Sequence, residues 1–115
     1  MSRLVLTIFL MSSLRVLACP EDSVALEEII SDTRNTVEGP FSIAELEASH
    51  MITIRETGEL LPFGYANKYW NAFKSNYQSA DEIYRATHRD NRFFIEEHIL
   101  VRNGCVIDSL LGEIS

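Results

Sequence analysis

The carboxylates Glu97 and Asp108 are the residues of this sequence whose spacing favours acid–base chemistry. They belong to two apolar segments joined by Asn103-Gly104, a dipeptide typical of a two-residue type I′ hairpin turn. In a straight register about this turn the two carboxylates lie diagonally on one face, with Cα atoms about 7–8 Å apart. Two carboxylates beside an apolar wall can have their pKa values pushed apart and act as acid and base. A bulge at Glu96-Glu97 would instead turn Glu97 toward solvent.

The two cysteines, Cys19 and Cys105, allow one intramolecular pairing. The residues before Cys19, Val16-Leu17-Ala18, resemble the lipobox of bacterial lipoproteins, in which the cysteine is lipidated and becomes the first mature residue. Cleavage by ordinary signal peptidase is the alternative, and it leaves Cys19 free to form a disulfide with Cys105 in an oxidising compartment. The lipobox match favours the lipid. A disulfide would lay the mature N-terminus across a face of the predicted sheet.

The histidines, His50, His88 and His98, do not have the spacing of a metal site, and the sequence contains no H-x-x-x-H or C-x-x-C pair. It also contains no G-x-S-x-G motif and no glycine-rich phosphate loop. The sequence therefore predicts no metal, no cofactor and no established catalytic motif.

Residues 1–18 have the layout of a secretory signal, with Arg3 near the start, an uncharged stretch from Leu4 to Leu14 and small residues before Cys19. The apolar run is shorter than the roughly 20 residues that span a membrane. We expect an exported protein in which 1–18 is a signal peptide and 19–115 is one globular domain of the cell envelope, with secretion in soluble form as the alternative.

The chain is acidic, with a formal net charge of −7 and an isoelectric point near 4.8. Binding to nucleic acid needs a cationic surface, so we expect no nucleic-acid partner. Contact with a membrane is expected only through a lipid on Cys19.

Periodicity and turn signals predict an α+β domain. Helices are expected over 23–33, over 42–49 after the capping box Ser42-x-x-Glu45, and over the aromatic segment 66–78. A three-stranded antiparallel meander is expected at 82–88, 93–102 and 105–111, joined by one or two strands from 51–61. This order of elements resembles that of nuclear-transport-factor-2-like domains, and the resemblance implies a cone-like, curved sheet packed against two or three helices.

The predicted register sorts the meander into two faces. It places Ile95 opposite Ala86 and His98 opposite Ile83. One face is the more apolar, and we expect it to lie under the helices; its members are Val101, Val106, Ile99, Leu110, Ile95, Ala86, Tyr84 and Phe93, with Glu97 and Asp108. The other face mixes apolar and polar residues and is the predicted binding surface; its main members are Arg85, Phe94, Glu96, His98, Leu100, Arg102 and Ile107.

The function predicted from these features is binding rather than catalysis. The chain is expected to be a small exported bacterial protein that binds a protein partner, a ligand or a second copy of itself through its 83–111 sheet face. An inhibitor-type or immunity-type role fits this expectation. The alternative is a small carboxylate-dependent hydrolase that uses Glu97 and Asp108.

Overall fold

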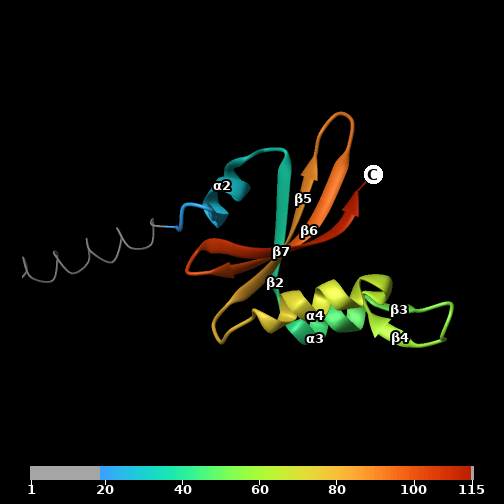
Figure 1. Ribbon diagram of the computed structural model, residues 1–115. Coiled ribbons are helices and arrows are strands. Elements are labelled where there is room, and N and C mark those ends of the chain that lie inside the picture. The colour runs from blue at the N-terminus through green and yellow to red at the C-terminus, as the bar shows by residue number, and fades with distance from the viewer. Residues whose placement is uncertain (1–18, 115) are drawn as a thin grey trace, which may run out of the picture.

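Five antiparallel strands form a curled sheet in the computed structural model, which describes residues 19–114 (Figure 1). Their order across the sheet is β1-β7-β6-β5-β2. The strands are β1 (Val24–Ala25), β2 (Asn35–Phe41), β5 (Glu82–Arg89), β6 (Phe94–Arg102) and β7 (Cys105–Ile114). The predicted α+β class, the curved antiparallel sheet and its C-terminal meander agree with this architecture.

The edge strand β2 was not predicted, because Glu38-Gly39-Pro40 has the composition of a chain break. Proline cannot donate a backbone hydrogen bond and is therefore confined to edge strands and bulges. Here Pro40 meets both conditions, since β2 is an edge strand and its pairing with β5 is irregular between Glu38 and Phe41.

The strands β3 (Met51–Thr53) and β4 (Leu60–Pro62) pair with each other in a separate two-stranded sheet. The hairpin was predicted, but its addition to the main sheet was wrong. In Figure 1 it projects beside helices α3 and α4, away from the five-stranded sheet.

Within residues 19–114, three helices accompany the sheet: α2 (Leu26–Ser31), α3 (Ile43–Ser49) and α4 (Asn67–Ser75), the last preceded by the 3-10 turn η1 (Gly64–Ala66). The capping box at the start of α3 is confirmed, since Ser42 Oγ accepts from Glu45 N at 3.0 Å and Ser42 N donates to Glu45 Oε1 at 2.8 Å. Helix α2 begins later than predicted. Ser23 donates its hydroxyl to Val106 O at 2.7 Å, and residues 24–25 form β1 instead.

The Asn103-Gly104 hairpin is confirmed, with φ of 54° and 78° at its two residues. Val101 pairs with Val106 as predicted, but Leu100 pairs with Asp108, so Ile107 is an extra, bulged residue. A one-residue insertion moves every later residue of the strand to the opposite face. The predicted faces of β7 are therefore wrong beyond Ile107.

A second irregularity lies between Glu96 and Glu97, and here the extra residue belongs to β7 rather than to β6. The predicted β5–β6 register is also wrong, because Ile95 lies opposite His88 rather than Ala86. That error is an even number of residues, so it leaves the two faces of β5 and β6 unchanged.

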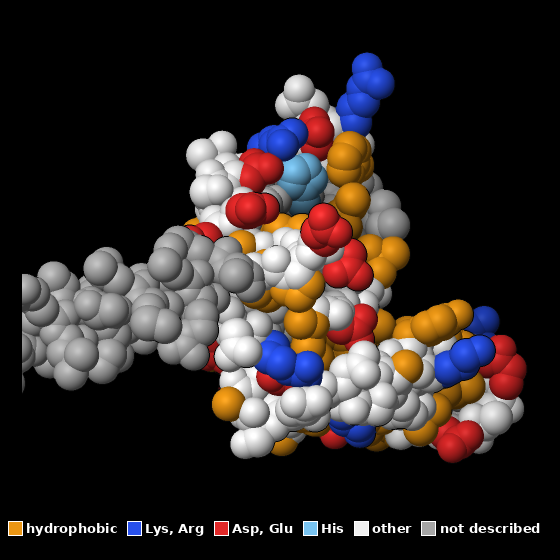
Figure 2. Space-filling view, turned by 60° about the vertical axis from the view of Figure 1, so that its left-hand side comes forward, with side chains coloured by type: hydrophobic (Ala, Val, Ile, Leu, Met, Phe, Trp, Pro, Cys, Tyr) orange, Lys and Arg blue, Asp and Glu red, His pale blue; other side chains and the backbone are white. Residues whose placement is uncertain are grey.

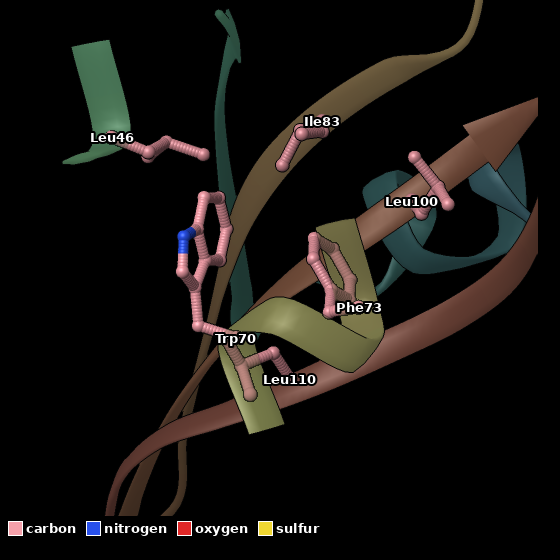
Figure 3. Close-up of a cluster of buried hydrophobic side chains, with 6 residues drawn as sticks. All are labelled: Leu46, Trp70, Phe73, Ile83, Leu100 and Leu110. Carbon is pink, nitrogen blue, oxygen red and sulfur yellow. The ribbon is translucent and has the colours of Figure 1, made fainter. Parts of the chain in front are cut away.

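Both faces of the sheet are covered by helices. On the side of α3 and α4 the buried cluster, drawn in Figure 3, consists of Leu46, Trp70, Phe73, Ile83, Leu100 and Leu110. On the side of α2 the cluster is Ala86, Ile99 and Val101, packed with Leu26, Ile29, Val37, Tyr84 and Val106. The expectation of one covered and one open face is thus wrong, because α3 and α4 pack on the face predicted to be open.

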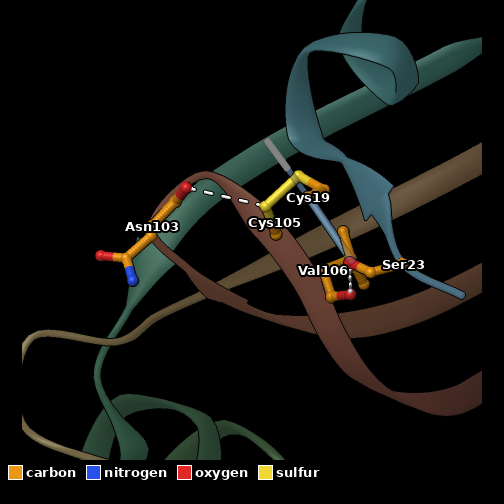
Figure 4. The surroundings of a disulfide bond; sticks show 5 residues. All are labelled: Cys19, Ser23, Asn103, Cys105 and Val106. Atoms are coloured by element: carbon orange, nitrogen blue, oxygen red, sulfur yellow. Dashed lines mark hydrogen bonds between the residues drawn. A yellow bond between two sulfur atoms is a disulfide. The ribbon is translucent and has the colours of Figure 1, made fainter. Parts of the chain in front are cut away.

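Cys19 and Cys105 form a disulfide, with their Cα atoms 5.6 Å apart (Figure 4). The chain after Cys19 continues as β1, which pairs Ala25 with Cys105 along the edge of β7. The N-terminal segment therefore extends the sheet and does not cross its face, contrary to the expectation. The sulfur that a lipid would occupy is bonded to Cys105 in this structure.

The predicted signal at 1–18 lies outside the described residues. Across residues 19–114, no helix has the length and apolar character that crossing a membrane requires.

Candidate functional site

Strand β7 separates two hollows in the surface. The first, which we call the α4 groove, lies between α4 and β7 and has a volume of about 480 Å³. Its lining is mostly apolar and consists of Ala66, Tyr69, Ala72, Phe73, Asp108, Ser109, Leu110 and Leu111. Helix α4 forms one wall because its inner face anchors Trp70 and Phe73 in the core, which leaves Tyr69 on the outer side.

The other wall of the α4 groove is a free strand edge. Strand β1 pairs only with Cys105 and Val106, and within residues 19–114 no strand pairs with the outer edge of β7 after that point. An edge of this kind presents backbone N–H and C=O groups that can pair with another chain. Edge and groove therefore lie side by side.

Among the described residues that line the α4 groove, Asp108 carries the charge. Its Oδ2 accepts from Asn76 Nδ2 at 2.7 Å, and its Oδ1 accepts from the backbone N–H of Ser109 at 2.8 Å. These two bonds fix the carboxylate at the rim, where oxygen lone pairs stay open to a cationic group.

The second hollow, the α2 cleft, lies between α2 and the sheet and has a volume of about 430 Å³. It is lined by Ile29, Asn35, Ala86, His88, Ile95, Glu97 and Leu111. Two cross-strand rows explain its shape, one joining Asn35, His88 and Ile95 and the next joining Ala86, Glu97 and Leu111. Ala86 carries only a methyl group, so the floor of the cleft is low between His88 and Glu97.

Asn35 sets the tautomer of His88. The amide Nδ2 of Asn35 donates to Ile29 O at 2.9 Å, which leaves its Oδ1 as the group that meets His88 Nδ1. Because Oδ1 can only accept, His88 Nδ1 carries the proton. In the neutral ring Nε2 is then a hydrogen-bond acceptor, and no group among the described residues donates to it.

Glu97 is the third polar residue that lines the α2 cleft, after Asn35 and His88. Burial raises the pKa of its carboxyl above the ordinary value. Within residues 19–114 no side chain or backbone group donates a hydrogen bond to it, so the carboxylate is left to solvent or to a ligand.

Glu97 and Asp108 do not share a site. Glu97 pairs with Leu111 and faces the α2 cleft, whereas Asp108 pairs with Leu100 and faces the α4 groove. The bulge at Ile107 is the reason, because it moves Asp108 to the opposite face from the straight register. The carboxylate pair on which the predicted hydrolase depends is therefore not formed.

The predicted binding surface is divided by the fold. His98 and Leu100 are buried, at 1% and 0% exposure, so they cannot touch a partner. Arg102 is engaged with Asp81, to which its Nη2 donates at 2.7 Å. Arg85 is engaged with Glu38, to which its Nη2 donates at 2.9 Å.

The remaining predicted surface residues are Phe94 and Glu96, which are neighbours on one face of β6, and Ile107 on β7. Phe94 and Glu96 are half-buried toward the far end of β6, and Arg89 lies over the Phe94 ring at 5.0 Å. Ile107 is exposed at the bulge. Ile107 lies beside Arg102, since both line a hollow with Ser75, Asn76 and Gln78. Phe94 and Glu96 share the sheet face of Arg85 toward the other end of β6.

Sequence reasoning missed Tyr69, Asn35 and His88 as site residues. Tyr69 lies in the segment 66–78, which was predicted only as a helix, although its position next to the large apolar Trp70 could have marked it as facing outward. Asn35 carried no usable signal, because the strand that aligns it with His88 was not predicted. In the described part of the chain, no three His, Cys, Asp or Glu side chains come together as a metal site.

Comparisons with known proteins give no relative: no family model, no curated protein and no solved structure matches the chain.

Proposed function

We propose that this chain is an exported binding protein that accepts an extended segment of a partner protein along the free edge of β7, in the α4 groove. The observation that carries the proposal is the unpaired edge of β7 next to an apolar groove. An added strand would satisfy the backbone groups of the edge and would place alternate side chains in the groove.

The character of the groove defines the chemistry of the partner segment. Tyr69 and Leu111 are large apolar side chains at 62% and 54% exposure, which favours apolar side chains at alternate positions of the segment. Asp108 at the rim and the overall charge of −7 favour a lysine or arginine beside them. The expected partner segment is thus apolar, extended and basic.

The sequence of the free edge of β7 favours a role in pairing with another chain, because it lacks most of the features that protect exposed edges. Natural sheets protect their edges with lysines, prolines or short strands. From Ile107 to Gly112 the sequence "IDSLLG" carries neither lysine nor proline, and β7 is the longest strand, Cys105–Ile114. The irregularities at Ile107 and Gly112 and the carboxylate of Asp108 are its protection, and the residues between the two irregularities, Ser109 to Leu111, are left open to pairing.

Export is supported by the disulfide, since such bonds persist in oxidising compartments, and by the signal-like layout of residues 1–18. The bond also favours a released protein over a lipid-anchored one. Intact mass of the protein recovered from its host distinguishes the two: a chain starting at Cys19 and two hydrogens lighter than its reduced form supports release, and an added lipid mass contradicts it.

The binding proposal is tested with a displayed library of random linear peptides selected on the oxidised protein. We expect the selected peptides to alternate apolar residues around a lysine or arginine and to bind with micromolar affinity, about that of a small, one-strand interface. Backbone amides of residues 109–112 should become protected from hydrogen exchange on binding, because the peptide pairs with this edge.

A matched pair of variants locates the site. Leu111→Asp alters the groove, whereas Leu60→Asp alters an equally exposed leucine of β4, at 57% against 54% exposure, outside it. We expect at least tenfold weaker peptide binding for Leu111→Asp and no change for Leu60→Asp. Equal binding by both variants, or a concentration-dependent dimer that blocks the edge in the absence of peptide, would refute the proposal.

A further inference from the structure

The α2 cleft has a different chemistry from the α4 groove, and a ligand bound there does not require the peptide-binding function. Two of its polar groups, the Glu97 carboxylate and His88 Nε2, are acceptors. They lie on the same face of neighbouring strands as diagonal neighbours, and Ala86, which pairs with Glu97 and stands next to His88 on that face of β5, contributes only a methyl group. Such a pair is complementary to one group that donates several hydrogen bonds.

Apart from Asn35 and these two acceptors, the lining of the α2 cleft is apolar. Ile29 comes from α2, Ile95 from β6 and Leu111 from β7, so three elements surround the acceptors with aliphatic carbon. A volume of about 430 Å³ admits a small ligand but not a folded segment. Figure 2 shows that acidic and basic side chains mix around a histidine on the upper half of the molecule, with hydrophobic side chains below them.

Of the two acceptors, the His88 ring is held in place by hydrogen bonds before any ligand arrives. Asn35 is fixed by its bond to Ile29 O and holds the His88 ring with Nδ1 protonated. Glu97 stands on β6, the central strand of the sheet, between β5 and β7. Preorganised groups bind more tightly because less ordering is required when the ligand enters.

We propose that the α2 cleft binds an alkylammonium group, with the ammonium between Glu97 and His88 Nε2 and the carbon chain against Ile29, Ile95 and Leu111. An ammonium carries three N–H donors and a positive charge, which suits two acceptors in an acidic protein. A carboxylate ligand is disfavoured by the charge of Glu97, and an alcohol gains no ion pair. The group can belong to a free amine or to a lysine side chain.

The test uses three probes of equal chain length, hexylammonium, 1-hexanol and hexanoate, and a fourth, N-acetyl-lysine amide, for the lysine source. Binding is followed at millimolar concentrations by amide chemical shifts of the ¹⁵N-labelled oxidised protein. We expect hexylammonium or the lysine derivative to shift amides around residues 86–88 and 95–97, at least tenfold more tightly than hexanol. Which of the two binds identifies the source of the ammonium.

Neighbouring glutamates supply the control. Glu97→Gln removes the charge in the cleft, and Glu96→Gln removes one on the opposite face of the same strand, where Glu96 lies opposite Thr87. Only Glu97→Gln should abolish the preference for the ammonium. Because burial raises the Glu97 pKa, bound ammonium should also lower it in a ¹³C carboxyl titration, and hexanol should not.

The inference is overturned if neither ammonium probe perturbs the cleft, if hexanol binds as tightly, or if the preference survives in Glu97→Gln. Shifts confined to residues 108–111 and α4 would equally overturn it, since they would place the probe in the α4 groove.

Discussion

The buried imidazole of His98 should make the fold sensitive to mild acid. His98 is 1% exposed, and neither ring nitrogen has a hydrogen-bond partner. Its ring meets those of His50 and Phe63 edge-on, at 5.3 and 5.6 Å between centroids. Burial lowers the pKa of His98 from 6.5 to about 4, and the positive charges of His50 and Arg85 act in the same direction.

The sign follows from the competition for a proton between folded and unfolded chains. In the unfolded chain His98 has a pKa of 6.5 and binds a proton below that pH, whereas in the folded chain it remains unprotonated until about pH 4. Stability is therefore full above pH 6.5 and falls as the pH drops through this window. At about 1.4 kcal/mol per pKa unit the loss attributable to His98 is roughly 2 kcal/mol at pH 5 and about 3 kcal/mol at its limit.

The assay compares the wild type with His98→Leu, which is close in volume and cannot titrate. Urea unfolding is followed at several pH values between about 7.5 and 4.5 by fluorescence of Trp70, the single tryptophan. At neutral pH the variant should equal or exceed the wild type by about 1–3 kcal/mol, because two unsatisfied nitrogens are gone. Between pH 6.5 and 4.5 it should lose about 2 kcal/mol less than the wild type.

A second variant separates titration from packing. Ile99→Val alters the adjacent buried residue on the other face and should cost about 1 kcal/mol at every pH, with the wild-type slope retained. Parallel loss of stability by the wild type and His98→Leu would refute the reasoning, as would an NMR titration of His98 near pH 6.5 in the folded protein.

Three further changes probe other contacts. Replacing Cys19 and Cys105 together with serine removes a link across 86 residues and should destabilise the fold by about 3–5 kcal/mol in denaturant unfolding, with unchanged stability contradicting the bond. Gly64→Ala should cost about 2 kcal/mol or more by thermal unfolding, because φ is +54° and the new Cβ would lie 2.8 Å from Ile52 Cβ; a neutral effect would contradict this contact. Asp81→Asn should cost about 2 kcal/mol at pH 7, since the buried carboxylate accepts two bonds from its arginine. Arg102 also lowers the pKa of Asp81, so the loss of stability in the variant should disappear as the pH falls below 3.8. A loss of stability that is independent of pH would exclude the ion pair.

Local signals in the sequence predicted the elements whose structure is decided locally. Ser42 and Glu45 cap each other within one helical turn, and Asn103-Gly104 adopts positive φ in a two-residue turn. Both motifs contain the donors, acceptors or backbone freedom that they need, so they form wherever the chain places them. Helix α4 was also predicted from a local signal, the helical periodicity of the aromatic segment 66–78 that contains Trp70.

Features decided by contacts between distant segments were not predictable in this way. Strand β2 depends on pairing with β5, and its Gly39-Pro40 reads as a break when that partner is ignored. His98 was placed on an open face because strand alternation does not say which helices cover which side. Its neighbours His50 and Phe63 come from segments more than thirty residues away in the sequence.

The bulge at Ile107 determines both where Asp108 lies and which side chains of β7 reach the core. A straight register would put Asp108 beside Glu97 and would turn Leu110 away from α4, so that one polar site would form at the expense of the core. With the bulge, Leu110 is buried against Trp70 and Phe73, and Asp108 reaches Asn76 at the end of α4.

Leu111 shows the functional side of the same insertion. Because the bulge turns it to the face of Glu97, its side chain lines the α2 cleft, while its place on the free edge keeps it in the α4 groove as well. The two hollows are therefore not independent in space even though their chemistries differ. A strand added to β7 would contact one side of the Leu111 side chain, and an alkylammonium ligand in the α2 cleft would contact its other side. Binding of one ligand can therefore alter the affinity for the second through this one side chain.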